Sequence, residues 1–150
     1  MFDLLDIFRN PVLICGVTAW FIAQTLKVII TAWVEREFKF ERFHGSGGMP
    51  SSHTAIIVSA SFGIGYTQGF SSPLFALALI MSFIVMYDAS GVRRSVGKQA
   101  KLLNDIINEL FHDGKFHEEK LKELIGHKPL EVFAGAVLGI LVALAFFWRF

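Results

Sequence analysis

The sequence predicts an all-α protein, a polytopic membrane helix bundle with about four transmembrane helices and an amphipathic cytoplasmic helix. Apolar residues make up 53% of the 150 positions, with sixteen phenylalanines, whereas charged residues make up only 18%. The mean hydropathy of +0.53 is higher than a soluble domain of this length can hide in its core. Apolar runs alternate with short polar segments, and no linker divides the chain. We therefore expect one integral membrane domain over residues 1–150.

Two long apolar runs predict the first and last spans, over residues 11–34 and 130–148. A helix of about 20 residues crosses the hydrocarbon core, so each run is long enough. No apolar core with a small-residue cleavage site, as in a signal peptide, precedes the first run, so we expect this span to be retained. Lys27 lies well inside it and either snorkels to the nearer surface or points into a polar cavity.

Two shorter spans are expected at about 54–70 and 73–88, joined by an uncharged turn. Small residues recur at four-residue spacing on the second and last spans, a pattern that lets neighbouring helices approach closely. These stripes consist of Ala55, Ser59 and Gly63, and of Gly135, Gly139 and Ala143. They predict close packing within the bundle and are compatible with self-association into a homodimer.

The polar segment between the third and last spans contains a further helix. Apolar residues recur at helical spacing along one side of it, and polar residues occupy much of the rest. The apolar set is Val92, Val96, Ala100, Leu103, Ile107 and Leu110. Such an amphipathic helix either lies on the membrane or continues the third span outwards. We also expect an interfacial segment at 35–44 and a short charged helix at 118–125.

Basic residues are unevenly distributed between the two sides that four spans would create. Segments 35–53 and 89–128 share one side and hold most of the lysines and arginines, whereas the other side keeps only Arg9 and Arg149. The positive-inside rule therefore predicts a multi-pass protein of the cell membrane with both termini outside and the charged loops cytoplasmic. The residues that would share the cytoplasmic face include His53, Arg93, Arg94 and His127.

Charge and cysteine content exclude several classes of function. The net charge is +1 and no basic stripe interleaved with aromatic residues occurs, so we expect no nucleic-acid partner. The single cysteine, Cys15, lies inside an apolar run, which excludes an internal disulfide and a cysteine-based metal site. We expect Cys15 only to pack.

A glycine-rich loop that runs into a histidine, over residues 45–55, is the first candidate functional element. Pro50 and the two serines after it are helix start signals, and a helix start carries unpaired N–H groups and partial positive charge that hold an anion. Beside a bound phosphate ester, His53 would be placed to protonate a leaving alkoxide. A capped helix with an ordinary interfacial histidine explains the same residues equally well.

His127, at the start of the last span, is the second candidate. Glu131 follows in the first turn after Pro129, close enough to hydrogen-bond one imidazole nitrogen. That bond would fix the tautomer and raise the basicity of the other nitrogen, as a histidine nucleophile requires. A carboxylate that only stabilises the helix start gives the same pattern.

Both candidate elements resemble motifs of a known superfamily. Met49-Pro50-Ser51-Ser52-His53 resembles the Pro-Ser-Gly-His motif of the type-2 phosphatidic acid phosphatase and vanadium haloperoxidase superfamily, and residues 126–135 resemble its closing Gly-x-His-x-Pro-x-Asp-Val-x-x-Gly segment. With segments 87–94 and 99–104 between them, the chain is similar to the short divergent branch of bacterial membrane proteins named after that superfamily. This likeness covers most of residues 15–145.

The resemblance implies a phosphatase mechanism that uses no metal or other cofactor. His127 would attack phosphorus to form a phosphohistidine, Glu131 would orient it, and His53 would protonate the departing alcohol and later activate water. Fixed cations and N–H donors would stabilise the charge of the transition state. The phosphate-binding residues would be Lys27, Ser51 and Ser52.

The sequence departs from the superfamily pattern at several positions. Ser52 replaces the glycine before the second-motif histidine, and Glu131 replaces the third-motif aspartate. The arginine expected six residues before the nucleophile is Leu121, and the first motif's Arg-Pro pair is missing. Arg93 and Arg94 would supply these charges from a different helix, because a planar guanidinium suits phosphate.

Two functions from different classes follow. The first is a metal-independent membrane phosphatase that hydrolyses a phosphoric monoester or lipid pyrophosphate, with a phosphorylated lipid or prenyl diphosphate as substrate. The alternative is a non-catalytic membrane module that binds anionic lipid or a membrane partner with the same basic pocket. A third interpretation, a divalent metal held by His44, His53, Asp88 and His127, has no tight ligand spacing to support it.

Overall fold

The computed structural model describes residues 4–35, 48–110 and 126–148, and the chain is helical throughout these ranges apart from short connections. The elements are the 3-10 helix η1 (Leu4–Arg9), α1 (Pro11–Glu35), α2 (Ser52–Gln68), α3 (Pro73–Ser90), α4 (Val92–Leu110) and α5 (Pro129–Phe147). The prediction of an all-α membrane helix bundle is confirmed. The charged helix expected at 118–125, and the interfacial segment expected at 35–44 beyond its first residue, lie outside the described residues.

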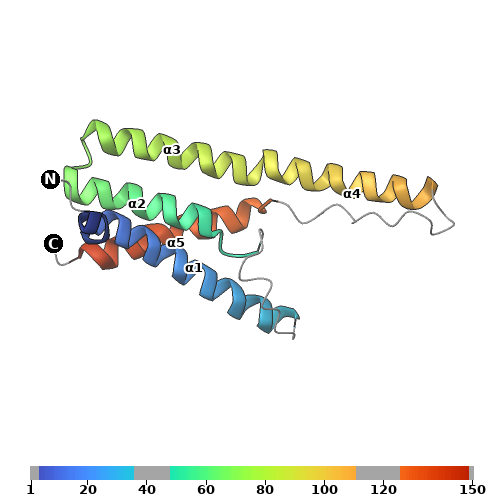
Figure 1. The fold of residues 1–150 in the computed structure, drawn as a ribbon, viewed down its shortest axis with the longest axis horizontal. Helices are drawn as coiled ribbons and strands as arrows, with labels where there is room; N and C mark the ends of the chain where they lie inside the picture. Colours follow the sequence, from blue (N-terminus) through green and yellow to red (C-terminus); the bar gives the residue numbers. More distant parts are fainter. Residues whose placement is uncertain (1–3, 36–47, 111–125, 149–150) are drawn as a thin grey trace.

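α2 is the central helix, because it packs against α1, α5 and α3 (Figure 1). Both predicted small-residue stripes are buried where these helices meet, namely Ala55, Ser59 and Gly63 of α2 and Gly135, Gly139 and Ala143 of α5. A Cβ atom added to Gly139 would lie 2.8 Å from the carbonyl oxygen of Ala55. The glycines are therefore what allows the two backbones to approach this closely.

Three helices are long and apolar enough to cross a membrane, judged by length and composition, and they cover Pro11–Trp33, Pro73–Ile107 and Pro129–Phe147. The predicted second span is α2, whose 17 residues make it the shortest of the α-helices. Its length of about 25 Å is slightly less than the thickness of a hydrocarbon core. Because α2 is surrounded by other helices, its serines and glycines face protein rather than lipid.

α3 lies at the edge of the bundle and exposes most of its apolar side chains, such as Leu77 and Phe83. Its attachment to α2 includes a hydrogen bond of 2.8 Å between the buried hydroxyls of Ser61 and Ser82. Beyond Gly91, α4 continues the direction of α3 (Figure 1). Of the two predicted arrangements for the amphipathic helix, the structure therefore shows the outward continuation of the third span.

Apolar packing is concentrated between α1, α2 and α5. One cluster joins Ala19, Ala23 and Ala55, and another joins Cys15, Ala143 and Phe147. Cys15 is fully buried, and its thiol also donates a hydrogen bond of 3.9 Å to the carbonyl oxygen of Ser59. These contacts hold the three helices in register and so fix the relative positions of their ends, where the candidate site lies.

Candidate functional site

The two histidines singled out by the sequence lie side by side at one end of the bundle. His53 is in the first turn of α2, and His127 comes two residues before α5. Their ring centroids are 6.2 Å apart and the rings are nearly perpendicular, at 78°. His127 is only 2% exposed, whereas His53 is exposed. One imidazole is therefore held inside the protein while its neighbour borders the outside.

Main-chain hydrogen bonds tie three helix ends together around this pair. The N–H of His127 donates to the carbonyl oxygen of Ala89 near the end of α3, at 3.0 Å. The N–H of Ser51 donates to the carbonyl oxygen of Glu131 in α5, at 2.9 Å. A Cβ atom added to Gly135 would lie 2.5 Å from the carbonyl oxygen of Ser51, so glycine is needed for this approach. Backbone contacts between α2, α3 and α5 thus position both histidines.

The two predicted phosphate-binding serines begin α2. The hydroxyl oxygen of Ser51 accepts hydrogen bonds from the N–H of Thr54 at 3.4 Å and from the hydroxyl of Thr54 at 3.1 Å. Ser51 is therefore the N-cap of the helix. Ser52 is the first helical residue and is also buried. The positive end of the α2 dipole lies at the same end of the bundle as the histidine pair.

Lys27 points into the bundle and does not snorkel. It is 2% exposed, although lysine is almost never this deeply buried without a partner. Its stem packs on the glycine-rich loop, because a Cβ atom added to Gly48 would lie 3.2 Å from its Cγ atom. Gly48 has a φ of 93°, which also favours glycine. The Lys27 ammonium interacts electrostatically with the Glu131 carboxylate, so α1 contributes a cation to the same end of the bundle.

Glu131 takes part in capping α5. Its Oε2 atom accepts a hydrogen bond of 3.1 Å from the N–H of Lys128. This is the helix-start arrangement that the sequence left open beside the histidine-orienting one. Its electrostatic attraction for Lys27 comes in addition to this bond, so the carboxylate both caps the helix and acts on the buried lysine. An orienting role toward His127 stays a prediction.

Arg93 and Arg94 are in the first turn of α4, just after the α3–α4 junction. Their main chain is therefore only a few residues along the chain from Ala89, whose carbonyl binds the N–H of His127. Their side chains lie outside the described part of the structure, and so do Leu121 and His44. A phosphate-binding role of the two arginines stays a prediction.

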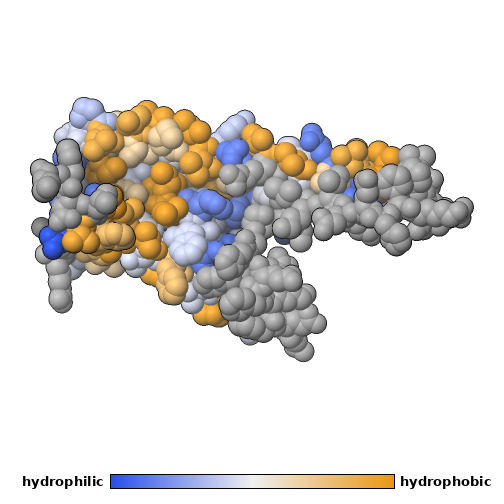
Figure 2. All heavy atoms as spheres, in the orientation of Figure 1, coloured by the Kyte–Doolittle hydropathy of each residue, from blue (hydrophilic) through white to orange (hydrophobic). Residues whose placement is uncertain are grey.

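The surface around this end of the bundle is hydrophilic. Figure 2 shows polar surface gathered between the hydrophobic surface of the bundle and α4, at the end where α2 and α5 begin. Among the described residues, no group of three histidine, cysteine, aspartate or glutamate side chains is placed to hold a metal ion. The arrangement thus consists of two imidazoles, a buried lysine and a helix start. Together these groups are suited to binding an anion.

Sequence analysis did not identify two of the residues that shape the site. Ala89 acts through its carbonyl oxygen, and a main-chain acceptor has no signature in its side chain. Gly48 supports the stem of Lys27, and its position in a glycine-rich loop was the available signal. Gly135 was predicted as a packing residue of the last span, and its contact with Ser51 makes it a support of the site as well.

Comparison with known proteins shows which family the chain belongs to. The model of a family described as the Divergent PAP2 family matches residues 8–142. The chain belongs to the Divergent PAP2 family. The match includes α1 to α4, most of α5 and the two histidines. The resemblance drawn from the two sequence motifs is therefore confirmed at the level of the family.

A relative of this Divergent PAP2 protein occurs in Bacillus subtilis (strain 168), where it is described as the uncharacterized membrane protein YuiD. The two chains are 36% identical over 157 aligned residues, which cover 97% of this chain and 99% of YuiD. No solved structure matches the chain. The comparisons establish a membrane protein of the Divergent PAP2 family, consistent with the three apolar helices of spanning length.

Proposed function

We propose that this Divergent PAP2 protein is a membrane-embedded phosphatase that hydrolyses a phosphorylated lipid or prenyl diphosphate. The observation that carries the proposal is the pairing of His53 with His127, at 6.2 Å between ring centroids, at the polar end of the bundle. Buried Lys27 places a basic side chain at the same end. Two imidazoles and a cation together match the needs of phosphoryl transfer through histidine.

In the first step, a ring nitrogen of His127 attacks the phosphorus atom. The bond between phosphorus and the lipid oxygen breaks, and its electron pair stays on that oxygen. The imidazolium of His53 gives its proton to the departing oxygen, which leaves as an alcohol from a phosphate monoester or as the lipid monophosphate from a diphosphate. We assign His127 as the nucleophile because its main chain is fixed by the bond to Ala89 and its ring is buried, and His53 as the acid and base because it is exposed and so open to water.

In the second step, neutral His53 takes a proton from a water molecule. The oxygen of that water attacks phosphorus, the phosphorus–nitrogen bond breaks, and its electron pair returns to the ring of His127. Inorganic phosphate leaves with His53 again protonated. No metal is required, because Lys27, the start of α2 and the arginines at the start of α4 would stabilise the charge of the transition state. Glu131 would act as a positioning residue for this set.

The proposed orientation places the site at the cytoplasmic face of the cell membrane, with both termini outside. The starts of α2 and α5 lie together at the site, and the ends of α2 and α5 lie together at the opposite end of the bundle (Figure 1). By the positive-inside rule, the basic residues of segments 35–53 and 89–128 would then face the cytoplasm. The phosphate group of the substrate would then sit at the inner leaflet.

A second candidate is a non-catalytic module that binds anionic lipid or a membrane partner. The capping bond of Glu131 to Lys128 supports it, because a carboxylate engaged at a helix start is less available to orient a nucleophile. Buried Lys27 and the start of α2 would bind an anionic head group equally well without catalysing a reaction. The two candidates share the site and differ in whether a phosphorus–oxygen bond breaks.

Phosphate release from purified protein in detergent distinguishes them. For a phosphatase we expect His127→Ala to lower the rate about 1,000-fold or more and His53→Ala about 100-fold, since both groups act in the reaction. Gln68→Ala is the matched control, because Gln68 is exposed at the opposite end of the same helix as His53. Vanadate should inhibit the wild type. Equal rates for the wild type and both histidine variants would rule out the phosphatase.

A further inference from the structure

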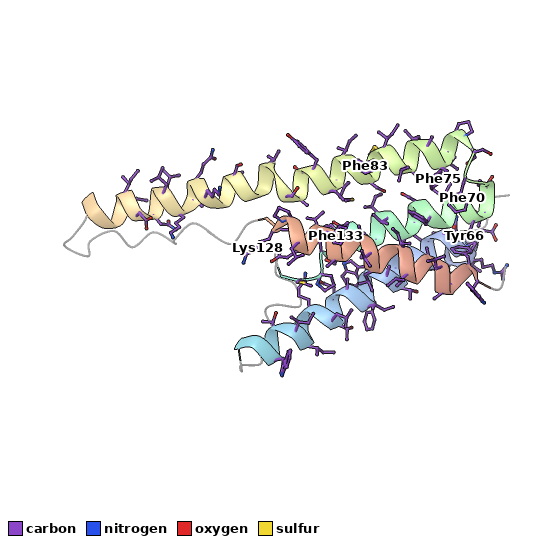
Figure 3. All side chains as sticks on the ribbon, turned by 180° about the vertical axis from the view of Figure 1, so that it is seen from behind. Tyr66, Phe70, Phe75, Phe83, Lys128 and Phe133 are labelled. Carbon is purple, nitrogen blue, oxygen red and sulfur yellow. The ribbon has the colours of Figure 1, made fainter. Side chains whose placement is uncertain are left out.

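An apolar groove between α1 and α5 begins beside the candidate site. Its volume is about 420 Å³, which is within the usual range of small-molecule pockets. The residues that line it include Leu26 and Ile30 of α1, Met49 and Pro50 of the loop, and Phe133 and Leu141 of α5. Figure 3 shows Phe133 close to the start of α5, near Lys128.

Each wall of the groove is continuous with the polar site. Leu26 directly precedes Lys27 on α1, and Pro50 directly precedes Ser51 in the loop. Leu130, which also lines the groove, directly precedes Glu131 on α5. The hydrocarbon-lined surface and the buried charges therefore meet at one boundary.

The groove runs from that boundary toward the middle of the bundle. Its lining on α5 extends from Leu130 to Leu141, which corresponds to about 16 Å along the helix axis. Leu130, Phe133 and Leu141 are all exposed, so the groove opens toward lipid along its length. A molecule that entered from the bilayer would thus reach the site with its polar end leading.

A second apolar groove, of about 550 Å³, does not adjoin the site. It is lined by residues of α1, α2 and α3 that include Val12, Ala60, Gln68 and Leu74. Gln68 ends α2 and Leu74 is in the first turn of α3, so this groove lies toward the opposite end of the bundle. A chain attached to a phosphate at the histidine pair would not reach it.

We infer that the groove between α1 and α5 binds the hydrocarbon chain of a single-chain lipid phosphate, whose phosphate group occupies the Lys27 and His127 site. This inference rests on the proposed function and narrows its substrate class from phosphorylated lipids in general to those with one chain. Lys27 and His127 at the site are each 2% exposed, and the second groove described above does not adjoin the site, so a second chain would have to cross buried polar groups to leave it.

Photolabelling of the full chain in lipid nanodiscs tests the inference without requiring catalysis. The probe is a single-chain alkyl phosphonate, which resists hydrolysis, with a diazirine near the end of the chain. Mass spectrometry of peptides should find the label on residues 130–141. Excess unlabelled phosphonate should lower the labelling at least tenfold, whereas the alcohol of the same chain length should not. Equal competition by the alcohol would show that the groove only dissolves hydrocarbon and would overturn the inference.

Matched substitutions show which of the two grooves binds the probe. Ala134 lines the groove beside the site, Ala60 lines the other one, and both are half-buried. Ala134→Phe should reduce labelling at least fivefold, whereas Ala60→Phe should leave it unchanged. If Ala134→Phe does not fold, Val137→Trp blocks the same groove from a more exposed position. Equal labelling of a blocked variant and the wild type would contradict the inference.

The length and number of hydrocarbon chains on the competing phosphonate provide a third test. Each added methylene should lower the phosphonate concentration that halves the labelling by up to about fourfold, the equivalent of ~0.8 kcal/mol. This trend should stop when the chain fills the groove. A two-chain phosphonate should compete at least tenfold more weakly than a single-chain one of equal chain length. Equal competition would overturn the single-chain claim. Because the probe is not cleaved, a protein that releases no phosphate from any substrate would refute the proposed function and leave this labelling pattern intact.

Discussion

The two ends of the helix bundle differ in chemistry, although α1, α2 and α5 contribute to both. At one end the buried side chains include polar and charged ones, namely Lys27, Ser51, Ser52 and His127. At the opposite end aromatic rings pack together (Figure 3), with centroid separations between 5.1 and 6.1 Å among Phe62, Tyr66, Phe70, Phe75 and Phe147.

This difference indicates what each end contributes. Packed aromatic rings stabilise a fold by about 0.5–1.5 kcal/mol per pair beyond the area they bury. Buried polar and ionisable groups instead cost free energy, and in a membrane protein they mark functional sites. We therefore attribute stability mainly to the aromatic end and binding to the polar end. Substitutions at the two ends should accordingly separate stability from activity.

The largest effect on stability is expected for Phe147→Ala at the aromatic end. Phe147 is 4% exposed and stacks on Tyr66 with an interplanar angle of 12°. Removing the ring should lower the free energy of unfolding by about 3 kcal/mol, measured by chemical denaturation in detergent micelles. Phe83→Ala is the control, because Phe83 is exposed on α3. A Phe147→Ala protein that was as stable as the control would show that the aromatic end does not hold the bundle together.

Gly135→Ala should affect both properties, because Gly135 lies where the packing of α5 meets the site. Its new Cβ atom would be 2.5 Å from the carbonyl oxygen of Ser51, so α2 and α5 must move apart. We expect a loss of about 2 kcal/mol of stability together with a loss of phosphate release.

Gly16→Ala is the matched control for this substitution. The nearest atom to its added Cβ, on Ile56, is 3.4 Å away, an ordinary contact. Its thermal midpoint and phosphate release should therefore equal those of the wild type. A Gly135→Ala protein with full activity would indicate that the approach of α5 to α2 does not position the histidines.

Lys27→Met should have the smallest effect on stability and a selective effect on binding. Replacing a buried ammonium with an apolar side chain of similar length removes a desolvation cost, so the thermal midpoint should stay the same or rise. The KM for a phosphorylated substrate should increase about tenfold, the equivalent of ~1.4 kcal/mol. Lys98→Met, at an exposed position of α4, should change neither quantity. Loss of stability in Lys27→Met with an unchanged KM would assign Lys27 to the fold instead of the site.

Helix positions were predictable because the chain marks them with local signals. Pro73 opens α3 and Pro129 opens α5, and the long apolar runs after Pro11 and Pro129 define the first and last spans. The start of α2 was predicted at residue 54 and is observed at Ser52. The shift arises because Ser51 caps the helix through the N–H of Thr54, so Ser52 and His53 belong to its first turn.

The arrangement of the candidate site was predictable only in part. The predicted order of spans placed His53 and His127 on one face, because each was expected at the start of a helix, and the structure puts both at one end of the bundle. The burial of Lys27 depends on the approach of the glycine-rich loop, and the position of His127 depends on the carbonyl of Ala89. Contacts between backbones of distant segments are set by tertiary packing, and composition or periodicity does not encode them locally.

The central claim, that His127 becomes covalently phosphorylated, is tested most directly by acid-free quenching and mass spectrometry of protein turning over a lipid phosphate. The account predicts a phosphohistidine at His127 in the wild type and a larger amount of it in His53→Ala, where the water that cleaves it is not activated. Continued phosphate release by His127→Ala, or turnover by the wild type with His127 never modified, would contradict the account.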